Sequence, residues 1–427
     1  MNNDATPGAE TDVVVFDSPD STQVRDVMSA VRGRVAEIPE RTTLADTELR
    51  TTVEREVDGV LQRRTLGDEV ERGRLRDAVL DELLGFGPVQ DILDDPSVSE
   101  IMVNGPGQVW VETAGVLRLS NRRFESTEQL LHVIDRMVRT SGRRVDQSSP
   151  MVDARLPDGS RLNVVLPPLA VDGPSVTIRK FTSSGLTTED LVAQGSLSPE
   201  SAEFLQSAVS SRMNIVVSGG TGTGKTTVLN ILSSFIGRDE RVVTVEDAVE
   251  LTLRLPNLVR LETRPMNSEG AGEVSIRDLV RNALRMRPNR IVVGEVRGSE
   301  TIDMLQAMNT GHEGSLSTVH ANSPRDALRR METMILLGGV DLPLRAIREQ
   351  IASSIDLVVH LARDARGRRF VNTITEVAGI EGEVVSTAEI FNRDPAGVAP
   401  PDGALPTLAP TGVGSRRIEM RRERGAR

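Results

Sequence analysis

A glycine-rich segment in the middle of the chain has the residue types and spacing of a phosphate-binding loop. It reads Gly219-Gly220-Thr221-Gly222-Thr223-Gly224-Lys225-Thr226-Thr227 and matches the pattern G-x-x-x-x-G-K-[ST]. The glycines allow a tight turn in which successive backbone N–H groups point at phosphate oxygens. Lys225 would contact the β and γ phosphates, and Thr226 would offer its hydroxyl to Mg²⁺. The segment therefore predicts a site for ATP and Mg²⁺ that extends as far as Thr227.

The residues on either side of this loop favour the same interpretation. Asn214-Ile215-Val216-Val217 is typical of a buried strand, and a helical pattern opens at Lys225. The N-terminus of that helix would add its positive end to the phosphate site. An ordinary glycine-rich turn would rarely have both neighbours, so we interpret the motif as functional.

A phosphate loop needs an acidic partner on a neighbouring strand. The apolar stretch Ile291-Val292-Val293-Gly294 ends at Glu295. Because Mg²⁺ keeps several of its waters in proteins, Glu295 would support the metal through a water molecule.

A second acidic segment lies between the phosphate loop and Glu295. It runs over residues 244–251 and contains Glu246, Asp247 and Glu250. Three carboxylates crowded at a strand end are costly unless a metal or a water gives them a role. One of them could polarise the attacking water as a general base. The alternative is a solvated acidic loop.

Two of the four histidines, His312 and His320, lie in the next conspicuous segment. His320 ends an apolar stretch, and a histidine there could donate a hydrogen bond to the γ phosphate. A lone histidine is more often structural, so this role depends on the neighbouring motifs. No role is predicted for His132 or His360.

The elements that must position these residues divide the chain into two domains. From about residue 190 apolar strands alternate with helices, which predicts a parallel sheet. The expected organisation is a disordered segment over 1–50, an α+β domain over 51–180, a linker over 181–190, an α/β domain over 191–392 and a disordered arginine-rich tail over 393–427.

Composition excludes several classes of protein. The chain has 427 residues, a net charge of −11, no cysteine, no tyrosine and one tryptophan. An acidic chain with so few aromatic rings is not expected to coat DNA or RNA, so no direct nucleic-acid partner is expected. A chain without cysteine cannot form disulfides or thiolate zinc sites. There is no apolar run of membrane-spanning length and no secretory signal at the N-terminus.

The four segments at 219–226, 244–251, 291–295 and 317–322 resemble, in this order, the Walker A, acidic, Walker B and histidine boxes of type II and type IV secretion ATPases. The N-terminal half resembles the Flp/Tad pilus assembly branch of that family. The matching phrases lie at residues 81–82, 85–88, 95–105, 142–146, 150–161 and 175–180. Small departures are Thr223, where serine is common, and Asn289, where aspartate often precedes the Walker B strand. The absence of cysteine also argues against the branches that carry a four-cysteine zinc module.

The resemblance implies an α/β fold: a RecA-like P-loop NTPase domain with a smaller N-terminal α+β domain. It implies that Glu250 is the general base, with Glu246 in support, that Glu295 supports the metal, and that His320 senses the γ phosphate. Arg161 and Arg179 match arginines that the N-terminal domain brings to the nucleotide.

At the level of the whole particle, the resemblance implies a homo-hexamer that hydrolyses ATP and acts on inner-membrane platform proteins. Such an enzyme would be cytoplasmic, at the inner face of the cell membrane, and peripheral to the membrane at most. The arginines after Gly414 could contact anionic lipid or an acidic partner, and a solvated tail is the alternative.

Three other interpretations stay open. One is a DNA-transfer ATPase of a type IV secretion system, in the same class. Another is a nucleotide-dependent scaffold without turnover, although the intact Glu250, Glu295 and His320 argue against it. The last is a small-molecule P-loop kinase, for which the sequence has no evident lid or acceptor pocket.

Overall fold

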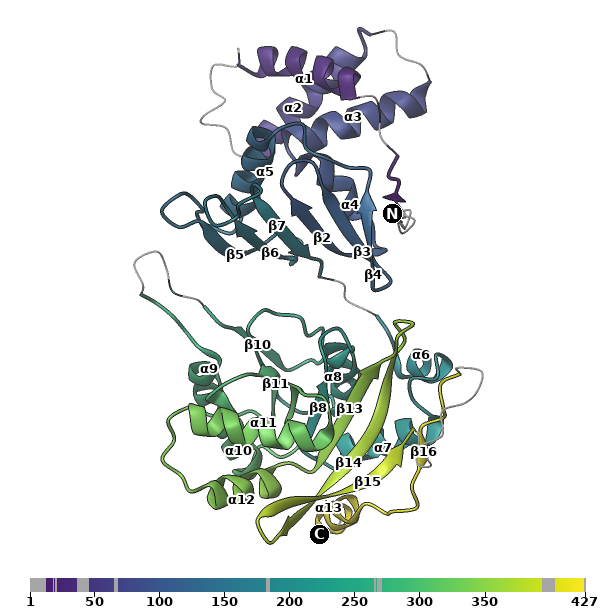
Figure 1. Ribbon diagram of the computed structural model, residues 1–427, viewed down its shortest axis with the longest axis vertical. Helices are drawn as coiled ribbons and strands as arrows, with labels where there is room; N and C mark the ends of the chain where they lie inside the picture. The colour runs from purple at the N-terminus through teal and green to yellow at the C-terminus, as the bar shows by residue number, and fades with distance from the viewer. Residues whose placement is uncertain are drawn as a thin grey trace, which may run out of the picture. The chain divides into compact units, whose positions relative to one another are not determined.

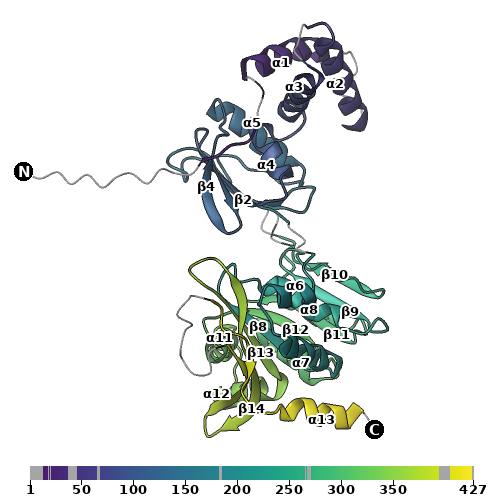
Figure 2. The same ribbon diagram turned by 90° about the vertical axis from the view of Figure 1, so that its right-hand side faces the viewer.

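The computed structural model describes residues 13–17, 19, 21–36, 46–64, 68–181, 185–264, 266, 271–393 and 404–425. They divide into two compact units, Met1–Thr182 and Ser183–Arg427. Figures 1 and 2 show each unit built around its own sheet. The expected linker residues 182–184 lie outside the described residues.

The first unit begins with a bundle of three helices. These are α1 (Ser21–Ala36), α2 (Asp46–Leu61) and α3 (Glu69–Leu83), and Asp68 caps the N-terminus of α3 with its side chain. Valine and leucine side chains at spacings of three and four form the buried centre of the bundle. They are Val27, Val31, Val53, Val57, Val60, Leu61, Leu75 and Val79.

An antiparallel sheet forms the rest of this unit. Among the described residues its strand order is β1-β4-β3-β2-β7-β6-β5, with only β1 parallel to its neighbour. The strands are β1 (Val13–Val14), β2 (Val98–Asn104), β3 (Val109–Thr113), β4 (Val116–Ser120), β5 (Met151–Arg155), β6 (Arg161–Val165) and β7 (Ser175–Arg179). The helices α5 (Thr127–Arg139) and α4 (Gln90–Asp94), which follows the short 3₁₀ turn Gly87–Val89, bury one face of the sheet.

The second unit contains the parallel sheet that the sequence predicts. Its described strands have the order β10-β9-β11-β12-β8-β13-β14-β15-β16, and the first six are parallel. The bounds are β8 (Ile215–Gly219), β9 (Val242–Glu246), β10 (Leu258–Glu262), β11 (Arg290–Val296), β12 (Leu316–His320), β13 (Leu357–Arg363), β14 (Arg369–Glu381), β15 (Val384–Asn392) and β16 (Ala409–Pro410). The central strand β8 is buried along its whole length, as expected of a strand covered on both faces.

Helices cover both faces of this sheet, as Figure 2 shows. On one face lie α6 (Thr188–Ala193), α7 (Pro199–Ser210) and α8 (Lys225–Ser234), and on the other α9 (Ile276–Ala283), α10 (Glu300–Asn309), α11 (Pro324–Leu337) and α12 (Leu344–Ser354). The expected α/β fold with a smaller α+β unit before it is confirmed.

Two of the segments expected to be irregular contain regular structure. Helix α1 lies within the first fifty residues, and Val13–Val14 forms β1 beside β4. Asn121 stabilises this strand, because its side chain accepts a hydrogen bond from Phe16 N at 2.9 Å and donates one to Phe16 O at 2.9 Å. The linker expected to extend to residue 190 instead gives way to α6 at Thr188.

The tail expected to be disordered also contains a helix, α13 (Arg416–Gly425). Arg417 and Arg421 pair with the buried Asp356, with N–O distances of 2.8 and 2.6 Å. Arg393 is buried as well and donates to the backbone oxygens of Val371 and Ser196. Composition alone predicted a disordered arginine-rich tail. In the structure a buried carboxylate needs a cationic partner and buried carbonyls need hydrogen-bond donors, and these arginines supply both.

No helix among the described residues is long and apolar enough to cross a membrane.

Candidate functional site

The phosphate loop turns sharply from β8 into α8. Gly222 and Gly224 have φ angles of +67° and +92°, which favour glycine. A Cβ atom on Gly219 would lie 2.6 Å from Thr223 Oγ1, so a side chain there would distort the turn. Lys225 Nζ donates hydrogen bonds to the carbonyls of Gly219 and Gly220 at 3.1 and 2.8 Å. The lysine charge thus lies over the concave side of the loop.

The acidic segment lies beside the first turn of α8. Thr226 Oγ1 donates to Glu250 Oε2 at 3.4 Å. Glu246 ends β9, is 2% exposed, and its Oε2 accepts from the backbone N–H groups of Glu250 and Leu251 at 2.8 and 2.9 Å. Burial raises the pKa of Glu246 above its ordinary range. Glu246 therefore holds the backbone that presents Glu250 to Thr226.

Glu295 lies near the end of the adjacent strand β11. The pairing of β11 with β12 shifts between Val293 and Val296, and Thr318 Oγ1 in β12 donates to Gly294 O at 2.7 Å. This irregularity turns the half-buried Glu295 toward Arg297, whose Nη2 lies 2.6 Å from Glu295 Oε2.

Arg297 also lies 3.4 Å from Asp247 Oδ2 and so joins the two acidic segments. Burial opposes the charge of Arg297, but its hydrogen bond to Glu295 and the nearby carboxylates raise its pKa overall. Arg297 is not among the site residues that the sequence motifs predict. Its only signal is its place two residues after Glu295, which does not distinguish it from other surface arginines.

His320 is the last residue of β12 and lies opposite Gly219 in the register with β8. Burial, followed by the charges of Lys225 and Arg330, lowers the pKa of His320 below its ordinary value. The imidazole is therefore mainly neutral at neutral pH. His312, the other histidine of this region, is set apart from this edge before β12, and its carbonyl accepts from Ser315 Oγ at 2.7 Å.

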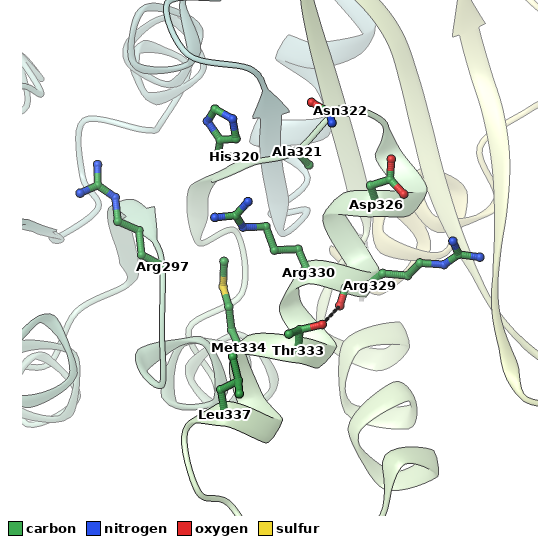
Figure 3. Close-up of a pocket in the computed structure, with 10 residues that line it drawn as sticks. All are labelled: Arg297, His320, Ala321, Asn322, Asp326, Arg329, Arg330, Thr333, Met334 and Leu337. Atoms are coloured by element: carbon green, nitrogen blue, oxygen red, sulfur yellow. Dashed lines mark hydrogen bonds between the residues drawn. The ribbon is translucent and has the colours of Figure 1, made fainter.

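A hollow of about 570 Å³ lies next to His320. Figure 3 shows the residues that line it. His320 and Asn322 lie at its rim, and Arg297 and Arg330 lie on its sides, with the Arg330 guanidinium directed toward the imidazole. Helix α11 supplies the opposite wall. His320 and Arg297 are the two residues of this sheet edge that line the hollow, whereas the phosphate loop, Glu250 and Glu295 are not among its lining residues.

Arg161 and Arg179 belong to the other unit. They lie opposite each other on β6 and β7, on the face away from the buried Leu162 and Ile178. Arg179 Nε is 3.7 Å from Glu100 Oε1. Arg155 on β5 pairs with Arg161 in the same register, so three arginines form a row across this face. The sequence motifs predict no role for Arg155.

Oxygen atoms are the metal ligands that this edge offers. No group of three or more histidine or acidic side chains within the described ranges is arranged to hold a metal ion alone. The predicted Mg²⁺ site at Thr226 and Glu295 does not require one, since Mg²⁺ usually takes one or two carboxylates together with phosphate oxygens and waters. The hydroxyl of Thr226 next to the Glu250 carboxylate fits that preference for oxygen.

Known proteins with similar sequences show which family this chain belongs to. The family model described as Type II/IV secretion system protein matches residues 82–389. A putative conjugal transfer protein of Mycobacterium tuberculosis is 41% identical over 325 residues, covering 75% of this chain and 92% of that one. The type IV secretion system protein VirB11 of Brucella abortus is 35% identical over 311 residues, covering 66% of this chain and 86% of that one.

Among solved structures, the Yersinia pseudotuberculosis ATPase DotB has a TM-score of 0.51 at 17% identity, covering 70% of this chain and 78% of that one. This likeness concerns the fold alone. The predicted membership of the type II/IV secretion ATPases rests on the family model and on the sequence relatives, which cover most of the chain. The chain belongs to the type II/IV secretion system protein family.

Proposed function

We propose that this protein is an ATPase motor that hydrolyses ATP to ADP and phosphate to power Flp/Tad-type pilus assembly or protein secretion. The observation that carries the proposal is the meeting of the phosphate loop, Glu250, Glu295 and His320 at one edge of one sheet. A phosphate-binding loop alone supports nucleotide binding, whereas the acidic and histidine side chains beside it are the groups that hydrolysis requires.

Each of these side chains has its own role in the reaction. Lys225, whose Nζ now bonds two loop carbonyls, exchanges them for β and γ phosphate oxygens. Glu250, next to Thr226, accepts a proton from the attacking water, and Glu246 keeps the Glu250 backbone in place. His320 contacts the γ phosphate as a neutral donor. Thr226, and Glu295 through a water molecule, would hold Mg²⁺, which would stabilise the charge on the phosphates.

Arg161 and Arg179 act from the N-terminal unit on the γ phosphate. A guanidinium presents planar donors that match phosphate oxygens, and an arginine on a separate unit can report whether the γ phosphate is present. Their positions opposite each other on the open face of the sheet support this role.

The resemblance of the N-terminal phrases supports the Flp/Tad assignment. On this proposal the chain forms homo-hexamers in the cytoplasm and acts on inner-membrane platform proteins. A deletion strain tests it: pilin at the cell surface should disappear, and the wild-type gene should restore it while the Lys225→Ala gene should not. Undiminished surface pilin in the deletion strain would contradict the assignment.

A second candidate is a DNA- or protein-transfer ATPase of a type IV secretion system. The names of the relatives favour it, since one is called a putative conjugal transfer protein and another a type IV secretion system protein. Mating assays on the same deletion strain separate the two candidates. Loss of DNA transfer with normal surface pilin would favour the second candidate.

The activity itself is tested by phosphate release from ATP with Mg²⁺. The wild-type protein should turn over ATP and Lys225→Ala should not. Equal background rates in the two proteins would favour the alternative of a nucleotide-dependent scaffold.

A further inference from the structure

A buried histidine lies directly under the phosphate loop. His360, on β13, is 6% exposed, and its Nδ1 is 2.9 Å from the hydroxyl oxygen of Ser218. Ser218 is fully buried on β8 and immediately precedes Gly219, the first residue of the loop. The two residues lie opposite each other in the parallel pairing of β13 with β8.

The same imidazole also contacts the loop that follows the histidine strand. It has a hydrogen bond to the backbone of Asn322, which lies two residues after His320. Strands β12 and β13 flank β8 on opposite sides. The ring of His360 therefore spans from one neighbour of the phosphate-loop strand to the other, and Asn322 is seen beside His320 at the rim of the hollow in Figure 3.

The backbone around His360 and the nearby charges favour a neutral imidazole between Ser218 and Asn322. The pairing of β13 with β14 shifts between His360 and Leu361, an irregularity of the kind that re-aims a side chain. Burial lowers the pKa of His360, against the smaller effects of its bond to Asn322 and of Asp326. A neutral imidazole protonated at Nε2 can donate to the Asn322 carbonyl and accept from the Ser218 hydroxyl at the same time.

We propose that His360 is a positioning residue that holds the loop after His320 against the strand of the phosphate loop, and so sets where His320 stands relative to the γ phosphate. His360 acts through His320 and does not contact the nucleotide. The inference rests on the proposed function for the role of His320, and on the two hydrogen bonds for the coupling.

The experiment compares two substitutions of His360 in the full chain. His360→Leu removes both hydrogen bonds, whereas His360→Gln keeps one donor and one acceptor on a side chain of similar reach. We expect His360→Leu to lower kcat about tenfold, the scale of losing a correctly placed catalytic group, with the KM for ATP changed less than about twofold. His360→Gln should keep most of the activity. Equal losses in the two variants would contradict the proposal.

A double variant separates positioning from a general loss of structure. If His360 acts through His320, then His360→Leu should lower kcat no further in a protein that already carries His320→Ala. A second tenfold loss in the double variant would overturn the proposal. Thr373→Val is the matched control, because Thr373 is buried opposite His360 on β14 and its hydroxyl has no partner in the described part of the chain.

Hydrogen exchange gives a readout that does not depend on turnover. His360→Leu, or the milder Ser218→Ala if His360→Leu does not fold, should speed exchange of the backbone amides of residues 321–323 while α8 stays protected. Unchanged exchange in that loop would refute the coupling whether or not the wild-type protein hydrolyses ATP. If the wild-type protein does not turn over ATP but the variants show faster exchange in this loop, the result contradicts the proposed function and leaves the coupling through His360 intact.

Discussion

Arg297 pairs with Glu295, the carboxylate that the sequence points to as a metal support, at 2.6 Å. It also lies 3.4 Å from Asp247 in the other acidic segment. One guanidinium therefore balances carboxylates from two neighbouring strands. Like charges this close would otherwise repel, so the arginine lets the acidic groups stay together without a metal.

Removing this arginine should make the protein more responsive to Mg²⁺. We expect Arg297→Ala to lower the free Mg²⁺ needed for half-maximal turnover about threefold, since the loss of one nearby positive charge leaves the carboxylates more attractive to a cation. The measurement is turnover against free Mg²⁺ at fixed ATP. Arg329→Ala, on another wall of the same hollow, should leave the Mg²⁺ dependence as it is. If turnover depends on free Mg²⁺ in the same way in Arg297→Ala and in the wild type, Arg297 does not balance the charges of Glu295 and Asp247.

Glu250→Gln and Glu295→Gln should bind ATP but hydrolyse it about 100-fold more slowly, because the first removes the base that takes a proton from the attacking water and the second weakens the support of the metal. Binding of a non-hydrolysable ATP analogue, measured by fluorescence, should change little. Glu262→Gln is the control, an exposed carboxylate at the end of the neighbouring strand β10. A Glu250→Gln protein with wild-type turnover would exclude Glu250 as the general base.

Arg161→Ala should lower kcat at least about tenfold and leave the C-terminal unit folded, because a γ-phosphate contact stabilises charge in the transition state. Circular dichroism and phosphate release measure the two effects. Arg139→Ala, on an exposed part of α5, should have wild-type turnover. Unchanged turnover in Arg161→Ala would reject its proposed contact with the γ phosphate.

The pairing of α13 with Asp356 should matter for stability. Asp356 is 1% exposed, so the double variant Arg417→Ala/Arg421→Ala leaves a buried carboxylate without its cations and should lower the free energy of unfolding by about 3–5 kcal/mol. Denaturant unfolding measures this change. Adding Asp356→Asn should recover part of the loss, since the buried charge is removed.

Arg416→Ala is the matched control for the same helix, because Arg416 is exposed. It should unfold within about 0.5 kcal/mol of the wild type. A double variant as stable as Arg416→Ala would show that the two ion pairs contribute nothing.

Assembly is tested by light scattering. We expect hexamers in the presence of an ATP analogue and Mg²⁺. Monomers alone under these conditions would count against the ring.

The two histidines of β12 and β13 show how far the sequence could be interpreted. The sequence predicts a role for His320 because it ends an apolar stretch in a histidine box, and in the structure His320 lies opposite Gly219. His360 had no such signal, since its partners Ser218 and Asn322 are 142 and 38 residues away along the chain. Which strands flank β8 depends on contacts between distant segments, and a local pattern does not encode them.

The sequence alone determined an α/β fold with a smaller unit before it, and it predicted the phosphate loop with its acidic and histidine partners. These depend on short patterns in which neighbouring residues form one turn, strand or helix. Only the tertiary structure decided that Arg297 pairs with Glu295, that His360 joins strand β8 to the loop after β12, and that the arginines of α13 are bound to a buried Asp356. The physical reason is burial. The partner that a side chain finds, and the free energy that its charge costs when it is buried, depend on which distant segments exclude water from it.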